Sequence, residues 1–143
     1  MTDTILIGED EPVQRRMLTT LLTKKLGYKT VTAKNGRQVV KRVKAGNIDD
    51  ISAVLLDLEM PEMDGFEALK ALRQYRPDLP VIILTAQDDT GGAVTALKEG
   101  ASDFIVKPAD PAQLDVTLKN AIRMSTLSRE LTRLKRDRDG ALG

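Results

Sequence analysis

The chain contains no histidine and no cysteine. The absence of histidine excludes a phospho-histidine kinase, a histidine phosphotransfer module, a Ser-His-Asp triad and an imidazole zinc site. The absence of cysteine excludes a disulfide framework and any thiolate metal site, and it is compatible with a reducing compartment. Any polar chemistry must therefore rest on carboxylates, hydroxyls, lysine and arginine.

Long apolar runs and an excess of one charge are absent as well. No apolar stretch approaches the roughly 20 residues that span a bilayer, and the N-terminus lacks the basic and apolar regions of a signal peptide. We therefore expect a cytoplasmic protein without membrane contact. The 22 basic and 21 acidic residues give a net charge of +1, which favours neither nucleic acid nor an anionic membrane as a partner.

Short apolar runs alternate with longer segments of helical periodicity along the 143 residues, a length that fits one domain. The runs are mostly β-branched or aliphatic and are bounded by charged residues or turn formers, so they predict buried strands. Two uninterrupted runs, AVLL and VIIL, suit a sheet that is covered on both faces. The expected strands span residues 5–7, 29–33, 53–56, 81–84 and 104–106.

Helical spacing and capping residues predict a helix after each strand. Strands that alternate with helices imply right-handed crossovers and a parallel sheet. The first helix carries an apolar repeat formed by Val13, Met17, Leu18, Leu21 and Leu22. The expected helices begin at Pro12 and end by Gly27, follow Asn35-Gly36, run from Gly65 (capped by Asp64) to about Tyr75 and from about Ala93 to Lys98, and begin near Pro111 without a breaker until Gly140.

Polar residues follow four of the five expected strands. Glu9 and Asp10 come after the first strand, Asp57 ends the third, Thr85 closes the fourth and Lys107 follows the fifth. In open α/β sheets, ligands bind beyond the carboxyl ends of the strands. We therefore expect these side chains to share one edge of the sheet.

This set of side chains has a chemical meaning. Neighbouring strands lie roughly 4.8 Å apart, so Asp10 and Asp57 can reach one small cation if the first and third strands are neighbours. Oxygen ligands suit Mg²⁺. The hydroxyl of Thr85 and the ammonium of Lys107 suit phosphate oxygens. Together these groups can form and hold an aspartyl phosphate.

Four segments make the pattern more specific: LIGEDEPVQR, LLDLEMPEMDGFE, ILTA and GASDFIVKP, each at a strand end. In this order they resemble the receiver domains of response regulators over about residues 4–124. The resemblance implies an α/β class with a doubly wound, five-stranded parallel sheet of order 2-1-3-4-5, a flavodoxin-like (βα)5 fold. We expect residues 1–124 to form the receiver domain and residues 125–143 a helical extension or linker.

The resemblance also implies roles for the acidic residues. Asp57 corresponds to the phosphoacceptor and Asp10 to the main Mg²⁺ carboxylate. Glu9 assists the metal directly or through water, and the backbone carbonyl of Glu59 completes the protein's share of the metal shell. Glu9 departs from the commoner aspartate, and its longer arm leaves its direct metal contact open.

Thr85 and Lys107 correspond to the groups that hold the phosphoryl oxygens. Thr85 and Phe104 correspond to the family's switch residues, although Phe104 lacks a tyrosine hydroxyl and a plain core role stays equally open. The Lys107-Pro108 bond resembles the family's cis peptide. Gly91-Gly92 before the fourth helix could loosen the switching region.

By this resemblance the chain accepts a phosphoryl group from a histidine kinase or a histidine phosphotransfer protein. The face formed by the helix at 93–98, the strand at 104–106 and the helix from 111 then controls a dimer, an output domain or a target. Such a domain is a signalling switch and not an enzyme, because it catalyses only its own phosphorylation and dephosphorylation.

Three other functions place different demands on the sequence. A Mg²⁺-dependent phosphatase lacks support, because no DxDxT-like loop or cap insertion is present. A nucleotide-binding Rossmann domain is disfavoured, because GEDEP stands where a glycine-rich loop is needed. A binding module that works without phosphorylation stays open.

The last helix carries an apolar seam, since Met124, Leu127, Leu131 and Leu134 are spaced 3, 4 and 3 residues apart. The seam is too short for an independent coiled coil. A linker helix and a homodimer contact are both left open. Basic residues there alternate with acidic ones and no aromatic residue lies among them, so we expect no direct nucleic-acid contact.

Overall fold

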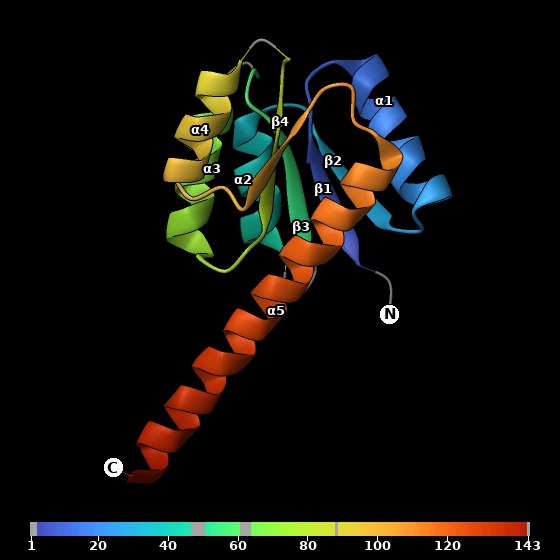
Figure 1. The fold of residues 1–143 in the computed structure, drawn as a ribbon. Helices are drawn as coiled ribbons and strands as arrows, with labels where there is room; N and C mark the ends of the chain where they lie inside the picture. Colours follow the sequence, from blue (N-terminus) through green and yellow to red (C-terminus); the bar gives the residue numbers. More distant parts are fainter. Residues whose placement is uncertain (1–2, 47–50, 61–63, 88, 143) are drawn as a thin grey trace.

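The computed structural model describes residues 3–46, 51–60, 64–87 and 89–142 and shows five parallel strands with helices between them (Figure 1). The α/β class and the alternation of strands and helices predicted from the sequence are confirmed. The strands are β1 (Thr4–Gly8), β2 (Lys29–Ala33), β3 (Ala53–Asp57), β4 (Val81–Thr85) and β5 (Asp103–Val106). The helices are α1 (Pro12–Thr20), its π-helical continuation η1 (Leu21–Lys25), α2 (Gly36–Ala45), α3 (Gly65–Tyr75), α4 (Thr90–Lys98) and α5 (Pro111–Leu142).

The strand order is β2-β1-β3-β4-β5, as expected from the resemblance. Side chains that alternate along each strand separate two cores, because successive residues of a strand point to opposite faces. Leu6 and Val54 pack with α2, α3 and α4 on one face, while Ile5 and Leu55 pack with α1 and α5 on the other. All residues of β3 and β4 are buried, which explains their uninterrupted apolar runs.

The helix starts follow local capping chemistry. Asp64 caps α3 as predicted, and Asn35 caps α2. Each accepts a hydrogen bond from a backbone N–H three residues on, at 2.9 and 2.8 Å. The predicted start of α4 near Ala93 was too late. Asp89 accepts from the N–H of Gly92 at 2.9 Å and caps the helix, so Gly91-Gly92 lies in its first turn.

The apolar repeat of the first helix divides into two groups. Leu22 is fully buried, and Leu18 and Leu21 pack against the core that α1 and α5 cover. Val13 and Met17 instead have exposed fractions of 62% and 65%. The first part of α1 therefore presents apolar side chains to solvent, which the spacing alone did not reveal.

Helix α5 extends past the sheet. It runs through Gly140 to Leu142 and projects beyond the rest of the domain (Figure 1). Its buried residues, Leu114 and Leu118, lie in its first part. Within the described part of the chain, no helix combines the length and the apolar character needed to cross a bilayer.

The start of α3 lies close to the end of β3 at Gly65. A Cβ atom at Gly65 would lie 2.6 Å from the Cα of Leu58 and 2.7 Å from the carbonyl oxygen of Asp57. Because backbone atoms cannot move aside cheaply, we expect Gly65→Ala to lower the free energy of unfolding in urea by about 1–3 kcal/mol.

Gly91 offers the matched control. A Cβ atom there meets nothing within 4 Å. Alanine favours a helix more than glycine does, so we expect Gly91→Ala to raise the free energy of unfolding by about 0.5–1 kcal/mol. Equal effects of the two substitutions would contradict the close approach at Gly65.

Candidate functional site

Sheet register brings the predicted site residues to one edge. Gly8 of β1 lies beside Leu56 of β3, and Asp57 lies beside Leu84 of β4. Thr85 in turn lies beside Val106 of β5. The carboxyl ends of these parallel strands are therefore level, and the residues at the strand ends face one region of space.

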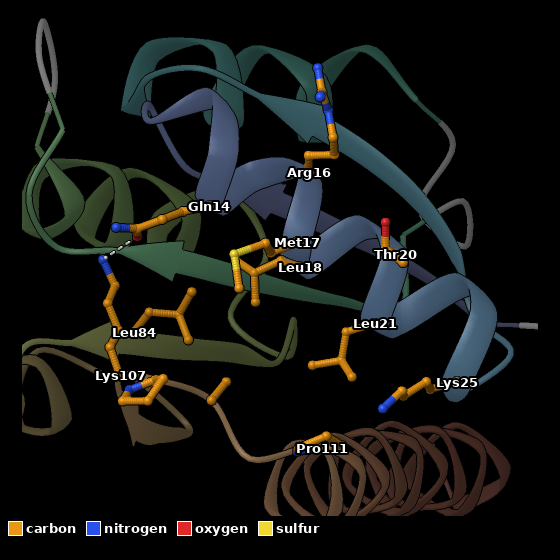
Figure 2. Close-up of a pocket in the computed structure, with 12 residues that line it drawn as sticks. Gln14, Arg16, Met17, Leu18, Thr20, Leu21, Lys25, Leu84, Lys107 and Pro111 are labelled. Carbon is orange, nitrogen blue, oxygen red and sulfur yellow. Dashed lines mark hydrogen bonds between the residues drawn. The ribbon is translucent and has the colours of Figure 1, made fainter.

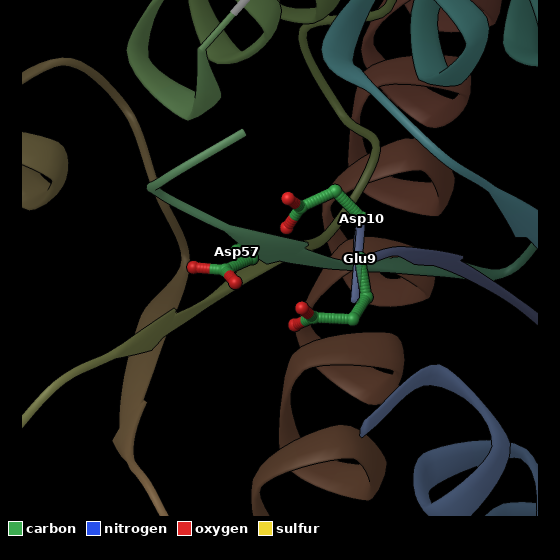
Figure 3. A group of neighbouring side chains, drawn as sticks. All are labelled: Glu9, Asp10 and Asp57. Carbon is green, nitrogen blue, oxygen red and sulfur yellow. The ribbon is translucent and has the colours of Figure 1, made fainter. Parts of the chain in front are cut away.

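Three carboxylates gather at this edge. One oxygen from each of Glu9, Asp10 and Asp57 lies within 4.8 Å of the others (Figure 3). Glu9 and Asp57 are 1% and 5% exposed, while Asp10 is exposed to solvent. Oxygen donors at this spacing, two of them buried, fit a hard divalent cation such as Mg²⁺.

Lys107 supplies the positive charge nearest to the carboxylates. Its Nζ donates to Asp57 Oδ2 at 2.8 Å and lies 3.6 Å from Glu9 Oε2. Burial lowers the pKa of Lys107, but the hydrogen bond and charge of Asp57 and the charge of Glu9 outweigh it, and the pKa is raised. The ammonium therefore stays charged. The peptide bond between Lys107 and Pro108 is cis, as the resemblance implied.

Glu9 has fewer hydrogen bonds than its burial requires. Its Oε1 accepts from the N–H of Glu11 at 3.2 Å, but the buried Oε2 accepts no hydrogen bond from the described residues. Burial, then the interaction with Asp57, raises the pKa of Glu9 to about 7, although Lys107 opposes the shift. Three carboxylates beside one ammonium leave excess negative charge, and a divalent cation would relieve it.

Residues around the acids hold their backbone in place. Arg15 donates from its guanidinium to the carbonyls of Glu9 at 2.9 Å and of Asp10 at 3.3 Å. Glu11 caps α1 by accepting from two backbone N–H groups. The sequence analysis missed Arg15, although it stands in the LIGEDEPVQR motif, because an arginine in a helix gives no sign of the carbonyls it reaches.

The residues that follow Asp57 border a hollow that Asp10 also lines. The N–H of Glu59 donates to Asp57 Oδ1 at 3.1 Å, which fixes the orientation of that carboxylate. The hollow, of about 500 Å³, adjoins the acids. Its lining includes Asp10, Glu59, Met60, Asp64, Phe66 and Asp89.

Thr85 and Phe104 lie at the side of the site toward α4. Thr85 is 3% exposed, and its hydroxyl donates to the carbonyl of Asp89 at 3.1 Å and not to Asp57. The hydroxyl thus ties the end of β4 to the start of α4. Phe104 is half-buried against the core that α2, α3 and α4 cover. Their expected switch roles stay predictions.

An apolar groove of about 790 Å³ runs beside Lys107 (Figure 2). Exposed Met17 lies on one wall, and Gln14 at the end nearest the acids bonds to Lys107 Nζ at 3.3 Å. Leu18, Leu21, Leu84, Ala109 and Pro111 complete most of the lining. The sequence analysis did not predict this groove, because its walls come from α1 and the segment before α5.

Comparison with known proteins agrees with the resemblance that the sequence motifs indicate. The family model for the response regulator receiver domain matches residues 5–119. The regulatory protein AtoC of Escherichia coli is 38% identical over 130 residues, which cover 91% of this chain but only 27% of AtoC. The chain therefore spans little more than a quarter of that protein.

Solved structures show the same likeness. A response regulator receiver domain protein from Clostridium thermocellum has a TM-score of 0.81 at 30% identity, covering 87% of this chain and 98% of that one. The receiver domain of the sensor histidine kinase PA1611 of Pseudomonas aeruginosa has a TM-score of 0.76 at 29% identity, covering 85% and 98%. In that structure a magnesium ion is coordinated in the active-site cleft.

Glu9 predicts a pH dependence of stability without divalent cations. Its pKa is about 7 in the folded chain against 4.5 for the free group. The contribution of the Glu9 carboxyl group to the free energy of unfolding is therefore complete below pH 4.5 and is lost as pH rises through 7. Glu9→Gln cannot ionise. We expect it to raise the free energy of unfolding in EDTA at pH 8, relative to the wild type, by on the order of 1–3 kcal/mol.

At pH 4 the two proteins should be nearly equal. Urea unfolding at both pH values measures the difference, and Glu59→Gln, at an exposed carboxylate, is the control. A gap between wild type and Glu9→Gln that did not change with pH would contradict the raised pKa.

Proposed function

Because the chain belongs to the family of response regulator receiver domains, we propose that Asp57 accepts a phosphoryl group with Mg²⁺ bound beside it. The observation that carries the proposal is the setting of Asp57. This carboxylate is buried at the end of β3, bonds to the Lys107 ammonium at 2.8 Å and shares a 4.8 Å cluster with two further acids.

Glu9, Asp10 and Asp57 would hold the metal, and the backbone carbonyl of Glu59 would join them. The buried Oε2 of Glu9, which accepts no hydrogen bond from the described residues, and the all-oxygen donor set support this assignment. When bound, Mg²⁺ neutralises charge on the phosphoryl oxygens during transfer. The magnesium-bound receiver of PA1611 is consistent with such a site.

Phosphoryl transfer needs an ionised Asp57 and a donor in line with it. A carboxylate oxygen of Asp57 forms the new O–P bond, while the P–N bond of the donor's phospho-histidine breaks and the imidazole nitrogen keeps the electron pair. The Lys107 ammonium, 2.8 Å from Asp57 Oδ2, would offer hydrogen bonds to the phosphoryl oxygens as negative charge gathers there.

The product would change the surroundings of Asp57, since it carries close to two negative charges and three acceptor oxygens. The Thr85 hydroxyl, now bonded to the Asp89 carbonyl, would donate to one of these oxygens. The start of α4 would then lose a tether and move, and Phe104 would follow. The face of α4, β5 and α5 would repack to control a dimer, an output domain or a target.

The groove beside Lys107 suits the phospho-histidine donor, a histidine kinase or a phosphotransfer protein. It is mostly apolar and opens next to the reacting carboxylate. Met17, 65% exposed on α1, would contact an apolar face of the donor. Docking there would bring a phospho-histidine close to Asp57 without covering α4 or β5.

Asp57→Asn should abolish Mg²⁺-dependent labelling by a small acyl phosphate, because an amide cannot attack phosphorus. Asp115→Asn, which removes a carboxylate on α5, is the matched control and should label as the wild type does. Intact mass spectrometry counts the phosphoryl groups. Undiminished labelling of Asp57→Asn would refute the phosphoacceptor assignment.

A binding module that works without phosphorylation makes a different prediction. It would show no response to beryllofluoride with Mg²⁺, whereas a phosphorylated switch should give spectral shifts at Thr85 and Phe104. Nuclear magnetic resonance titration of the wild type separates the two functions.

Met17→Glu should slow phosphoryl transfer from a phosphorylated histidine phosphotransfer protein, since a charge in an apolar contact centre weakens docking by about tenfold or more. Labelling by the small acyl phosphate should stay within about twofold, because Met17 lies outside the reacting groups. Val94→Glu, at an exposed apolar residue of α4, serves as control. Equal loss with both donors would place the effect in the site and not in docking.

A further inference from the structure

The projecting part of α5 carries an uncovered apolar stripe. Met124, Leu127, Leu131 and Leu134 have exposed fractions between 54% and 67%. Spacings of 3, 4 and 3 residues put them on one side of the helix, at positions a, d, a and d of a heptad. Four large apolar residues in a row on a charged helix have no role within the described part of the domain.

The opposite side of the same helix is held by its own domain. The hydroxyl of Ser125 donates to the carbonyl of Asp78 at 2.5 Å, and Arg129 Nε lies 3.3 Å from Asp78 Oδ2. In the heptad these residues occupy positions b and f, on the outer face of a coiled coil. The domain therefore fixes the helix by its outer positions and leaves positions a and d open.

We propose that this stripe is the seam of a parallel, in-register two-stranded coiled coil with a second copy of the chain. Charge complementarity selects a second copy and this orientation. Glu130 occupies position g and Lys135 the following e position, so each Glu130 faces a Lys135 of the other helix when the helices run parallel. In an antiparallel pair, g positions face each other, and the two Glu130 carboxylates would repel.

The seam also has a defined extent and strength. Arg138 stands at the next a position, where a parallel partner would present the same charge, so the apolar contact ends after Leu134. Four layers are fewer than the three or four heptads of an independent coiled coil. The dimer is therefore weak and dependent on concentration. None of its contacts involves Asp57, so it forms without a phosphoryl group there.

Cysteine cross-linking tests the register directly, because the chain has no native cysteine. In the full chain, Leu134→Cys at position d should form a disulfide-linked dimer under mild oxidation. Thr132→Cys, at the outer b position and equally exposed, should form at least about fivefold less. Equal yields at the two positions, or none at Leu134→Cys, would overturn the proposal.

A mixture of Met124→Cys and Leu134→Cys tests the direction. In a parallel coil each variant links to itself, whereas in an antiparallel coil the two variants link to each other. Predominant mixed dimers would overturn the parallel arrangement. Adding Asp57→Asn to Leu134→Cys should leave the yield unchanged, so a failure of the phosphoacceptor assignment stays distinguishable.

The charge pair is tested by reversal. Glu130→Lys should raise the dimer dissociation constant, measured by sedimentation equilibrium, by about two- to tenfold. Lys135→Glu added to it should recover most of the lost affinity, because the Glu130–Lys135 pair is then reversed. The recovery is not complete, because both variants lack the 2.5 Å contact of Glu130 with Arg133. Failure of rescue would overturn the Glu130–Lys135 pairing.

Discussion

The contact between the Lys107 ammonium and the buried Asp57 carboxylate, at 2.8 Å, is the interaction on which the site depends. It exists because β3, β4 and β5 are level at their carboxyl ends, so residues far apart in the chain meet at one edge. One ammonium does not balance Asp57 and the neighbouring acids. Burial is the largest cause of the raised pKa of Glu9, and the neighbouring Asp57 adds to it.

In the proposed function, the excess negative charge of the three acids explains why phosphoryl transfer to Asp57 needs a metal ion. A cation would stabilise the cluster of acids, and the charge that it adds would also favour the approach of a phosphoryl group to a carboxylate. Burial strengthens both effects, since charges interact more strongly where water is excluded. The Thr85 hydroxyl, bonded to the Asp89 carbonyl, ties the end of β4 to the start of α4. In the proposed function, a change of charge at Asp57 would act on α4 through this bond.

Two apolar surfaces lie outside the cores, and they serve different partners in our proposals. The groove at Met17 adjoins the reacting edge and suits a donor that must reach Asp57. The α5 stripe from Met124 to Leu134 projects away from the domain and suits a second copy. The groove meets α5 only at its first residue, Pro111, whereas the stripe begins at Met124, so both surfaces can be occupied at once.

Much of this arrangement was readable from the sequence. Strand runs such as AVLL, the cap Asp64 and the polar residues at strand ends are local signals that a single element carries. The expected strand order followed from the resemblance. Local signals could not show that α4 starts at Asp89, that Arg15 holds the acid loop, or that Met17 faces solvent while Leu22 is buried. The first two features depend on which hydrogen-bond partners the folded backbone brings within reach. The third depends on packing, because the burial of a side chain is set by neighbours from other elements.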